Sequence, residues 1–125
     1  MRVLLDTQVF LWAVAGSPRL KPPTRRLIEV ADAVYVSAAS IGEVAVKARL
    51  GKLEADPNDV TAAIDASGFL ELPVTASHAA GLGHPADDDR DPFDRLLIAQ
   101  ALAEPLRLLT ADAALAKFSD VVLVV

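Results

Sequence analysis

Short runs of apolar residues alternate along this chain with longer segments in which apolar positions recur every three to four residues. The short runs, rich in Val and Leu, are typical of strands, and the longer segments are typical of amphipathic helices. The predicted strands are Arg2–Leu5, Val34–Val36, Phe69–Leu72, Arg107–Leu109 and Val121–Val124. The predicted helices are 7–15, 23–31, 40–50, 58–67, 76–82, 92–103 and 111–117. Strands that alternate with helices predict an α/β fold with a mostly parallel, five-stranded sheet.

Length and composition predict one globular domain over residues 1–125. Hydrophobic residues make up 53% of the chain and charged residues 23%, as in ordinary globular proteins. The absence of cysteine excludes disulfides and thiolate metal sites. The longest apolar stretch, Val9–Ala15, is far shorter than the ~20 residues of a membrane span. With no recognisable signal peptide, the expected location is the cytoplasm, with no membrane partner.

The charge is unevenly distributed, although the net value is −5. Acidic residues crowd into 87–94, where most are expected to be solvated loop residues. Basic residues gather in two groups, which are Arg19, Lys21, Arg25 and Arg26, and Lys47, Arg49 and Lys52. A local basic rim can attract a polyanion even when the total charge is negative. The overall charge therefore neither supports nor excludes an RNA substrate.

Four acidic residues are predicted to begin helices near strand ends. Asp6 directly follows the first strand and Asp112 follows the fourth. Glu43 is expected in the first turn of the helix after the second strand, and Asp94 in the first turn of the sixth helix. Ligands of parallel α/β sheets bind beyond the carboxyl ends of the strands. We therefore expect these acids to meet at one rim of the sheet.

Each acid also has a purely structural interpretation. Acidic side chains favour the first turn of any helix, and Ser40 with Glu43 matches a capping box. Glu43 can pair with Lys47 at i, i+4, and Asp91 can cap the helix that carries Asp94. Convergence favours a functional interpretation, since two carboxylates about 4 Å apart repel by ~4 kcal/mol at an effective dielectric near 20. Mg²⁺ or Mn²⁺ suits such a cluster of oxygen ligands.

Four segments carry a family resemblance that spans nearly the whole chain. They are Leu4-Leu5-Asp6-Thr7, the run from Val36 to Lys47, the run from Asp91 to Ala101 that begins Asp-Pro-Phe-Asp-Arg, and Leu109-Thr110-Ala111-Asp112. In this order they resemble the PIN domain and, more closely, the VapC toxins of bacterial and archaeal toxin–antitoxin pairs.

The resemblance implies a PIN-like three-layer α/β/α fold and a Mg²⁺-dependent endoribonuclease, with Mn²⁺ as a substitute. It implies that the chain acts on RNA as a toxin, pairs with a VapB-type antitoxin protein and forms a homodimer. The implied catalytic and metal-binding residues are Asp6, Glu43, Asp94 and Asp112. Thr110 matches a position that often supplies a hydroxyl beside the metal. Arg95 and Lys47 are auxiliary candidates near metal or RNA, although either can instead pair with a nearby acid.

The chain departs from its nearest counterparts at Gln8, where His is common, and at Gly42, where Trp often precedes the Glu. Asp88 and Asp89 stand where His is frequent. These differences leave the four acids in place and bear on how RNA is held.

Two alternative functions remain open. One is a phospho-acceptor receiver domain, which needs an acidic pair after the first strand, whereas Asp6 is followed by Thr7 and Gln8. The other is a catalytically silent PIN scaffold that binds RNA or protein. His78 and His84 are expected to have surface or capping roles.

Overall fold

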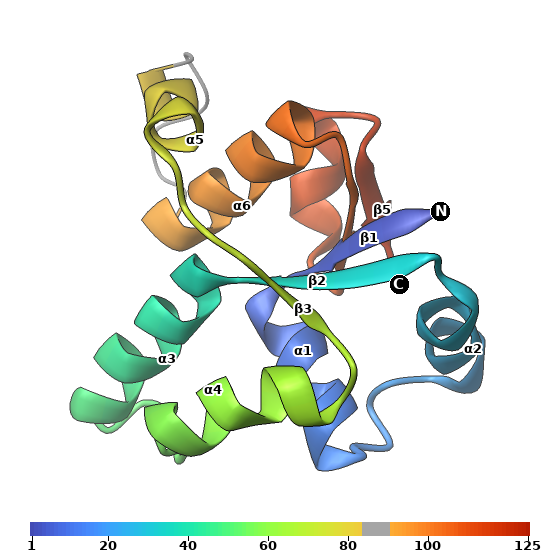
Figure 1. Cartoon of the computed structure of the whole chain (residues 1–125), viewed down its shortest axis with the longest axis vertical. Coiled ribbons are helices and arrows are strands. Elements are labelled where there is room, and N and C mark those ends of the chain that lie inside the picture. Colours follow the sequence, from blue (N-terminus) through green and yellow to red (C-terminus); the bar gives the residue numbers. More distant parts are fainter. Residues whose placement is uncertain (84–90) are drawn as a thin grey trace.

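Five parallel strands form one sheet in the computed structural model, which describes residues 1–83 and 91–125 (Figure 1). The strands are β1 (Arg2–Leu5), β2 (Ala33–Ser37), β3 (Leu70–Leu72), β4 (Arg107–Thr110) and β5 (Val122–Val124). Their order is β3-β2-β1-β4-β5, and every pairing is parallel. The predicted parallel, five-stranded sheet is confirmed. Because the chain builds outward from β1 to one edge and then returns to β4 on its other side, the strand order switches between β1 and β4.

Helices cover both faces of the sheet. They are α1 (Thr7–Ala15), α2 (Pro22–Val30), α3 (Ala38–Arg49), α4 (Pro57–Ala66), α5 (Ala76–Ala80) and α6 (Pro92–Ala103), with two 3₁₀ segments, η1 (Gly81–Gly83) and η2 (Ala113–Phe118). Figure 1 shows α1 to α4 on one face and α5 and α6 on the other. The predicted helices are confirmed with ends that differ by up to two residues, except that 111–117 is wrong in type and is replaced by the 3₁₀ segment η2.

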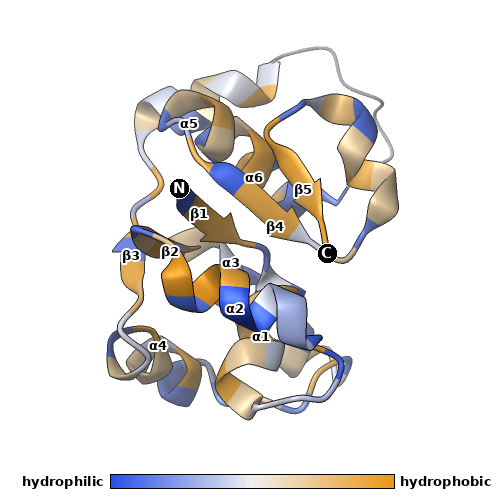
Figure 2. Cartoon of the chain, turned by 90° about the vertical axis from the view of Figure 1, so that its right-hand side faces the viewer, coloured by the Kyte–Doolittle hydropathy of each residue, from blue (hydrophilic) through white to orange (hydrophobic). Residues whose placement is uncertain are grey.

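The core is divided by the sheet into two layers. Val3 and Leu5 of β1 belong to the cluster under α1 to α4, whereas Leu4, between them, belongs to the cluster under α6 and η2. This alternation follows from the two-residue period of a strand. Both layers need apolar contacts from the sheet, and Figure 2 accordingly shows β4 and β5 coloured as hydrophobic. The result is the expected three-layer α/β/α arrangement.

Trp12 packs against the first of these clusters, so it is part of the core. Within residues 1–83 and 91–125, the helices fall short of the length and apolar composition that crossing a bilayer requires.

Candidate active site

Asp6 is the single residue between β1 and α1, and both of its carboxylate oxygens are engaged. Oδ1 accepts a hydrogen bond from the Val9 N–H at 2.8 Å and so caps α1. Oδ2 accepts from Thr110 Oγ1 at 2.5 Å, across from the end of β4. Only 6% of Asp6 is exposed, and this burial raises its pKa against the opposing effect of those two hydrogen bonds. A carboxyl group is thus fixed at the switch point of the sheet.

Glu43 lies in the second turn of α3, so the prediction of a first-turn position is wrong. The helix begins earlier, at Ala38, because Ser37 at the end of β2 caps it by accepting from the Ala39 N–H at 2.9 Å. Ser40 is therefore inside the helix and the predicted capping box is absent. Glu43 is 6% exposed, and its Oε1 accepts from Thr7 Oγ1 at 2.6 Å. Because Glu43 lies away from the start of the helix, this buried carboxylate is stabilised by its side-chain partners rather than by the helix terminus.

Asp94 lies in the first turn of α6, as predicted. The helix is capped by Asp91, which accepts from the Phe93 N–H at 2.8 Å, and Pro92 occupies its start. Burial, and after it repulsion from four other carboxylates, together raise the pKa of Asp94 to about 6. Those four are Asp91, Glu43, Asp6 and Asp112. The side chain is thus held within electrostatic reach of each of the other predicted site residues.

Asp112 begins η2, where its Oδ1 accepts from the Ala114 N–H at 3.0 Å. It is exposed, but its charge still raises the pKa of both Asp6 and Asp94. Thr110 connects two of these acids, because its hydroxyl donates to Asp6 and accepts from the backbone N–H of Asp112 at 3.0 Å. The resemblance implied a hydroxyl beside the metal at Thr110, and in the structure this hydroxyl contacts two of the four acids.

Lys47 brings a positive charge to these acids. Its ammonium pairs with Glu43 Oε2, as the i, i+4 spacing indicated, and lies 4.0 Å from Asp91 Oδ2. The hydrogen bond to Glu43 raises the pKa of Lys47, and the charges of Asp91 and Asp94 add to the effect of Glu43. Arg95 instead donates to the Leu82 carbonyl at 2.7 Å, a backbone acceptor that the sequence did not indicate.

The donor set of this site fits a hard divalent cation. Carboxylates, with a threonine hydroxyl beside them, are the oxygen ligands that Mg²⁺ and Mn²⁺ favour. Burial is the main cause of the raised pKa of Asp94, and repulsion from the nearby carboxylates adds to it; a cation would relieve this repulsion. In their present positions, no three His, Asp or Glu side chains of residues 1–83 and 91–125 are grouped closely enough to hold an ion.

Sequence reasoning missed two buried polar residues beside the acids. Thr7 lies within hydrogen-bond distance of both Glu43 Oε1 and Ser40 Oγ, the latter at 3.0 Å. Ser40 was expected to cap a helix, yet it is fully buried against Thr7. The available signal was the position of Thr7 next to Asp6 in an otherwise apolar stretch.

His78 has the predicted capping role but not a surface position. It is 1% exposed, and its Nδ1 accepts from the Thr75 N–H at 3.1 Å in a capping box. His84 and the Asp87–Asp89 run lie outside the described residues.

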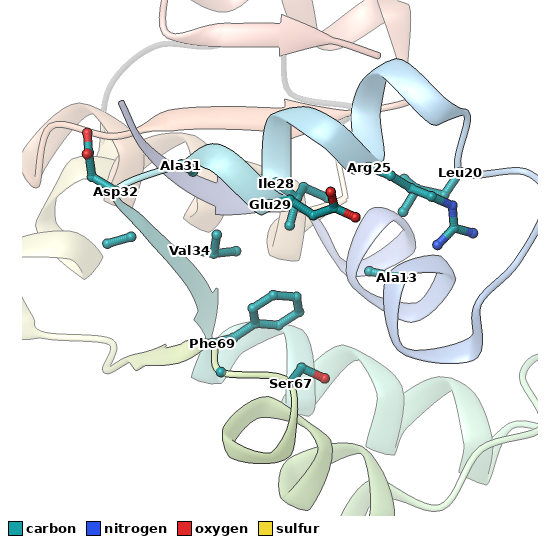
Figure 3. Close-up of a pocket in the computed structure, with 12 residues that line it drawn as sticks. Ala13, Leu20, Arg25, Ile28, Glu29, Ala31, Asp32, Val34, Ser67 and Phe69 are labelled. Atoms are coloured by element: carbon teal, nitrogen blue, oxygen red, sulfur yellow. The ribbon is translucent and has the colours of Figure 1, made fainter.

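A cavity away from the acids lies near the amino end of β2 (Figure 3). Arg25 and Glu29 of α2 line it together with Val34 and Phe69. None of the four predicted site residues contributes to it, so the candidate chemistry and this cavity are separate.

Comparison with known proteins identifies a family. The model of the PIN domain family matches residues 3–121. No curated protein matches the chain.

Three solved structures share the fold. VapBC2 from Rickettsia felis, bound to a DNA fragment from its promoter, gives a TM-score of 0.70 at 16% identity, with 100% of this chain and 98% of that chain covered. A toxin–antitoxin complex from Klebsiella pneumoniae gives a TM-score of 0.66 at 15% identity, with 97% of this chain and 95% of that chain covered. FitAcB from Neisseria gonorrhoeae gives a TM-score of 0.61 at 20% identity, with 100% of this chain and 97% of that chain covered.

Proposed function

This chain belongs to the PIN domain family, and from that premise we propose that it is a metal-dependent endoribonuclease over residues 1–125. We assign Asp6, Glu43, Asp94 and Asp112 as its catalytic, metal-binding residues. The observation that carries the proposal is the convergence of the four acids: Thr110 joins Asp6 to the backbone of Asp112, and the charges of Glu43, Asp6 and Asp112 add to burial in raising the pKa of Asp94. Repulsion between carboxylates lowers the stability of the folded chain, and a bound cation would neutralise it.

The proposed metal is Mg²⁺, with Mn²⁺ as a substitute, because both prefer carboxylate oxygens. When bound, such an ion activates water and stabilises the departing oxygen of a phosphodiester. The protein contributes rigid positioning of two ligands. Asp6 is fixed by the Val9 N–H and the Thr110 hydroxyl, and Glu43 is fixed by Thr7. We also propose that Lys47, half-exposed at the rim, and Arg95 contact RNA phosphates.

The strand order argues against a receiver domain. Receivers have the order 2-1-3-4-5, whereas this sheet is ordered β3-β2-β1-β4-β5. A catalytically silent PIN scaffold remains the outcome to exclude by experiment.

The decisive experiment is cleavage of a labelled single-stranded RNA by the purified chain in Mg²⁺ and in EDTA. The proposal predicts internal cleavage only with the metal. The double variant Asp6→Asn/Asp112→Asn, purified identically, controls for contaminating nuclease. Equal cleavage by the double variant, or none by the wild type in either Mg²⁺ or Mn²⁺, would contradict the proposal.

We further propose that the protein is a VapC-type toxin, active as a cytoplasmic homodimer and neutralised by a VapB-type antitoxin. The support is the fold shared with chains from three toxin–antitoxin systems. Expression of the chain alone should arrest growth, and co-expression of the protein encoded beside it should relieve the arrest. Light scattering should give twice the mass of one chain. A monomer without toxicity would contradict this assignment.

A further inference from the structure

The two oxygens of Glu43 are held by partners of different kinds. Oε1 accepts from Thr7 Oγ1 at 2.6 Å, and Thr7 is 8% exposed at the start of α1. Oε2 pairs with the ammonium of Lys47, whose side chain is 39% exposed. The hydroxyl is therefore part of the packed interior, whereas the ammonium lies on a flexible stem that reaches solvent. One oxygen is fixed, and the other has a partner that can leave.

The Lys47 ammonium lies among several carboxylates rather than beside one. Besides Glu43, it faces Asp91 Oδ2 at 4.0 Å, and the charge of Asp94 also acts on it. An ordinary i, i+4 pair on a helix surface joins two exposed side chains, but Glu43 is buried. The ammonium thus supplies positive charge to the site that the proposed function assigns to a metal.

We propose that Lys47 is a built-in counter-ion, which occupies Glu43 Oε2 in the metal-free protein and leaves it when a divalent cation binds. This inference rests on the metal site of the proposed function. A dication and an ammonium repel each other at short range, and Mg²⁺ or Mn²⁺ needs the oxygen that Lys47 covers. Thr7 stays on Oε1 in both states. Lys47 therefore keeps the empty site stable and weakens the metal affinity by competition.

Two other roles for Lys47 make different predictions. A lysine that only pairs with Glu43 as a helix surface contact leaves metal affinity unchanged. A lysine that only contacts RNA phosphate alters cleavage and RNA binding but leaves the affinity for a metal ion unchanged in the absence of RNA.

The test is the dissociation constant of Mn²⁺, measured without RNA by electron paramagnetic resonance at pH 8. Lys47→Met should bind Mn²⁺ roughly 5- to 30-fold more tightly than wild type, which corresponds to about 1–2 kcal/mol. Lys47→Arg keeps the charge and should remain near the wild-type affinity. Arg49→Met removes an exposed charge from the same helix and should change the affinity less than about 2-fold, because it is screened.

Thermal unfolding supplies the second readout. In EDTA, Lys47→Met should melt below wild type, because a buried carboxylate loses its partner, and saturating Mn²⁺ should raise its melting temperature more than that of wild type. If Lys47→Met does not fold, Lys47→Gln removes the charge while keeping a donor for Glu43.

Equal or weaker Mn²⁺ binding by the neutral variants would overturn the inference. Tighter binding without RNA cleavage by any form would support it and contradict only the nuclease proposal. A wild type that binds no Mn²⁺ would overturn both.

Discussion

Two polar clusters, each of which includes a residue of α6, differ in how their groups are matched. The acid cluster consists of Asp6, Glu43, Asp94 and Asp112. The His78 network consists of Ser37, Gln100, His78 and Glu104. In the first, carboxylates lie near one another, and their charges add to burial, the main cause that raises the pKa of Asp94 to about 6. In the second, donors face acceptors along a continuous path of hydrogen bonds.

The path of the His78 network crosses three elements. Ser37 Oγ at the end of β2 donates to Gln100 Oε1 at 2.5 Å, and Gln100 Nε2 donates to the Pro73 carbonyl at 3.2 Å. His78 Nε2 lies 2.6 Å from Glu104 Oε2. Every buried side-chain nitrogen and oxygen of the described residues has a partner. A fully matched network stabilises a fold, whereas carboxylates that repel one another destabilise it.

The largest expected effect is on the cleavage rate, from the substitution Asp6→Asn, which changes the acid cluster and leaves the His78 network intact. Outer-shell partners of a metal ligand alone contribute roughly 10–100-fold, so loss of a ligand in Asp6→Asn should reduce cleavage by at least roughly 100-fold. Asn keeps an oxygen for the Val9 N–H and is as good a cap as Asp, so the urea midpoint should change little. The measurements are initial cleavage rates and urea unfolding. Loss of activity together with unfolding would show that Asp6 is structural.

Breaking the network should give the opposite pair of results. Gln100→Leu leaves buried polar groups of Ser37 and Pro73 unpaired, and should cost about 2–4 kcal/mol of unfolding free energy. Cleavage by the fraction that remains folded should stay near wild type. Leu102→Ala, at a half-exposed position of the same helix, is the control and should cost much less. A stable Gln100→Leu with impaired cleavage would show that the network serves the site directly.

The acid cluster also predicts that metal-free protein becomes more stable as the pH falls from 7.5 to 5. The pKa of Asp94 is about 6 in the folded chain against 3.8 for an ordinary Asp. Between these values the folded state binds more protons than the unfolded state, so the free energy of unfolding rises on acidification. The gain should be about 1–3 kcal/mol, measured by urea unfolding in EDTA. Asp94→Asn should remove most of this gain, and a wild type whose stability falls over this range would contradict the raised pKa of Asp94.

The smallest expected effect comes from Gly42→Ala, which tests whether the backbone beside the acid cluster has to move. Gly42 precedes Glu43 inside α3, and an added Cβ would meet Phe93 at an ordinary 3.5 Å. Gly42→Ala should therefore stabilise the protein by about 0.5–1 kcal/mol through helix propensity, with cleavage unchanged. Gly51→Ala is the matched control, because its φ of 72° disfavours any side chain. Lower activity of Gly42→Ala would indicate that the backbone beside Glu43 must flex.

The sequence predicted the fold well because its signals are local. The bounds of α1 and α6 were predicted correctly, since Asp6 and Asp91-Pro92 are strong start signals. The start of α3 was missed because Ser37 and Ser40 are both competent caps, and only the end of β2 decides between them. The 3₁₀ form of η2 follows from tertiary packing that periodicity does not encode.

For the site, the sequence predicted the residue types and strand ends but not their partners. Thr110 was expected beside the acids, whereas the contact of Thr7 with Glu43 depends on how α1 packs against α3. The fully buried position of His78 depends on Glu104, which lies 26 residues away in sequence. Such pairings arise from the three-dimensional arrangement, so one sequence alone does not show them.

The central claim is that the acid cluster is kept for chemistry at the expense of stability, and Asp94→Asn tests it most directly. The amide still suits the first turn of a helix, where the lost charge is worth only ~0.3–1 kcal/mol. The account predicts a melting temperature in EDTA equal to or above that of wild type, together with a loss of Mg²⁺-dependent RNA cleavage of roughly 100-fold or more. Near-full, metal-dependent cleavage by Asp94→Asn would contradict the account.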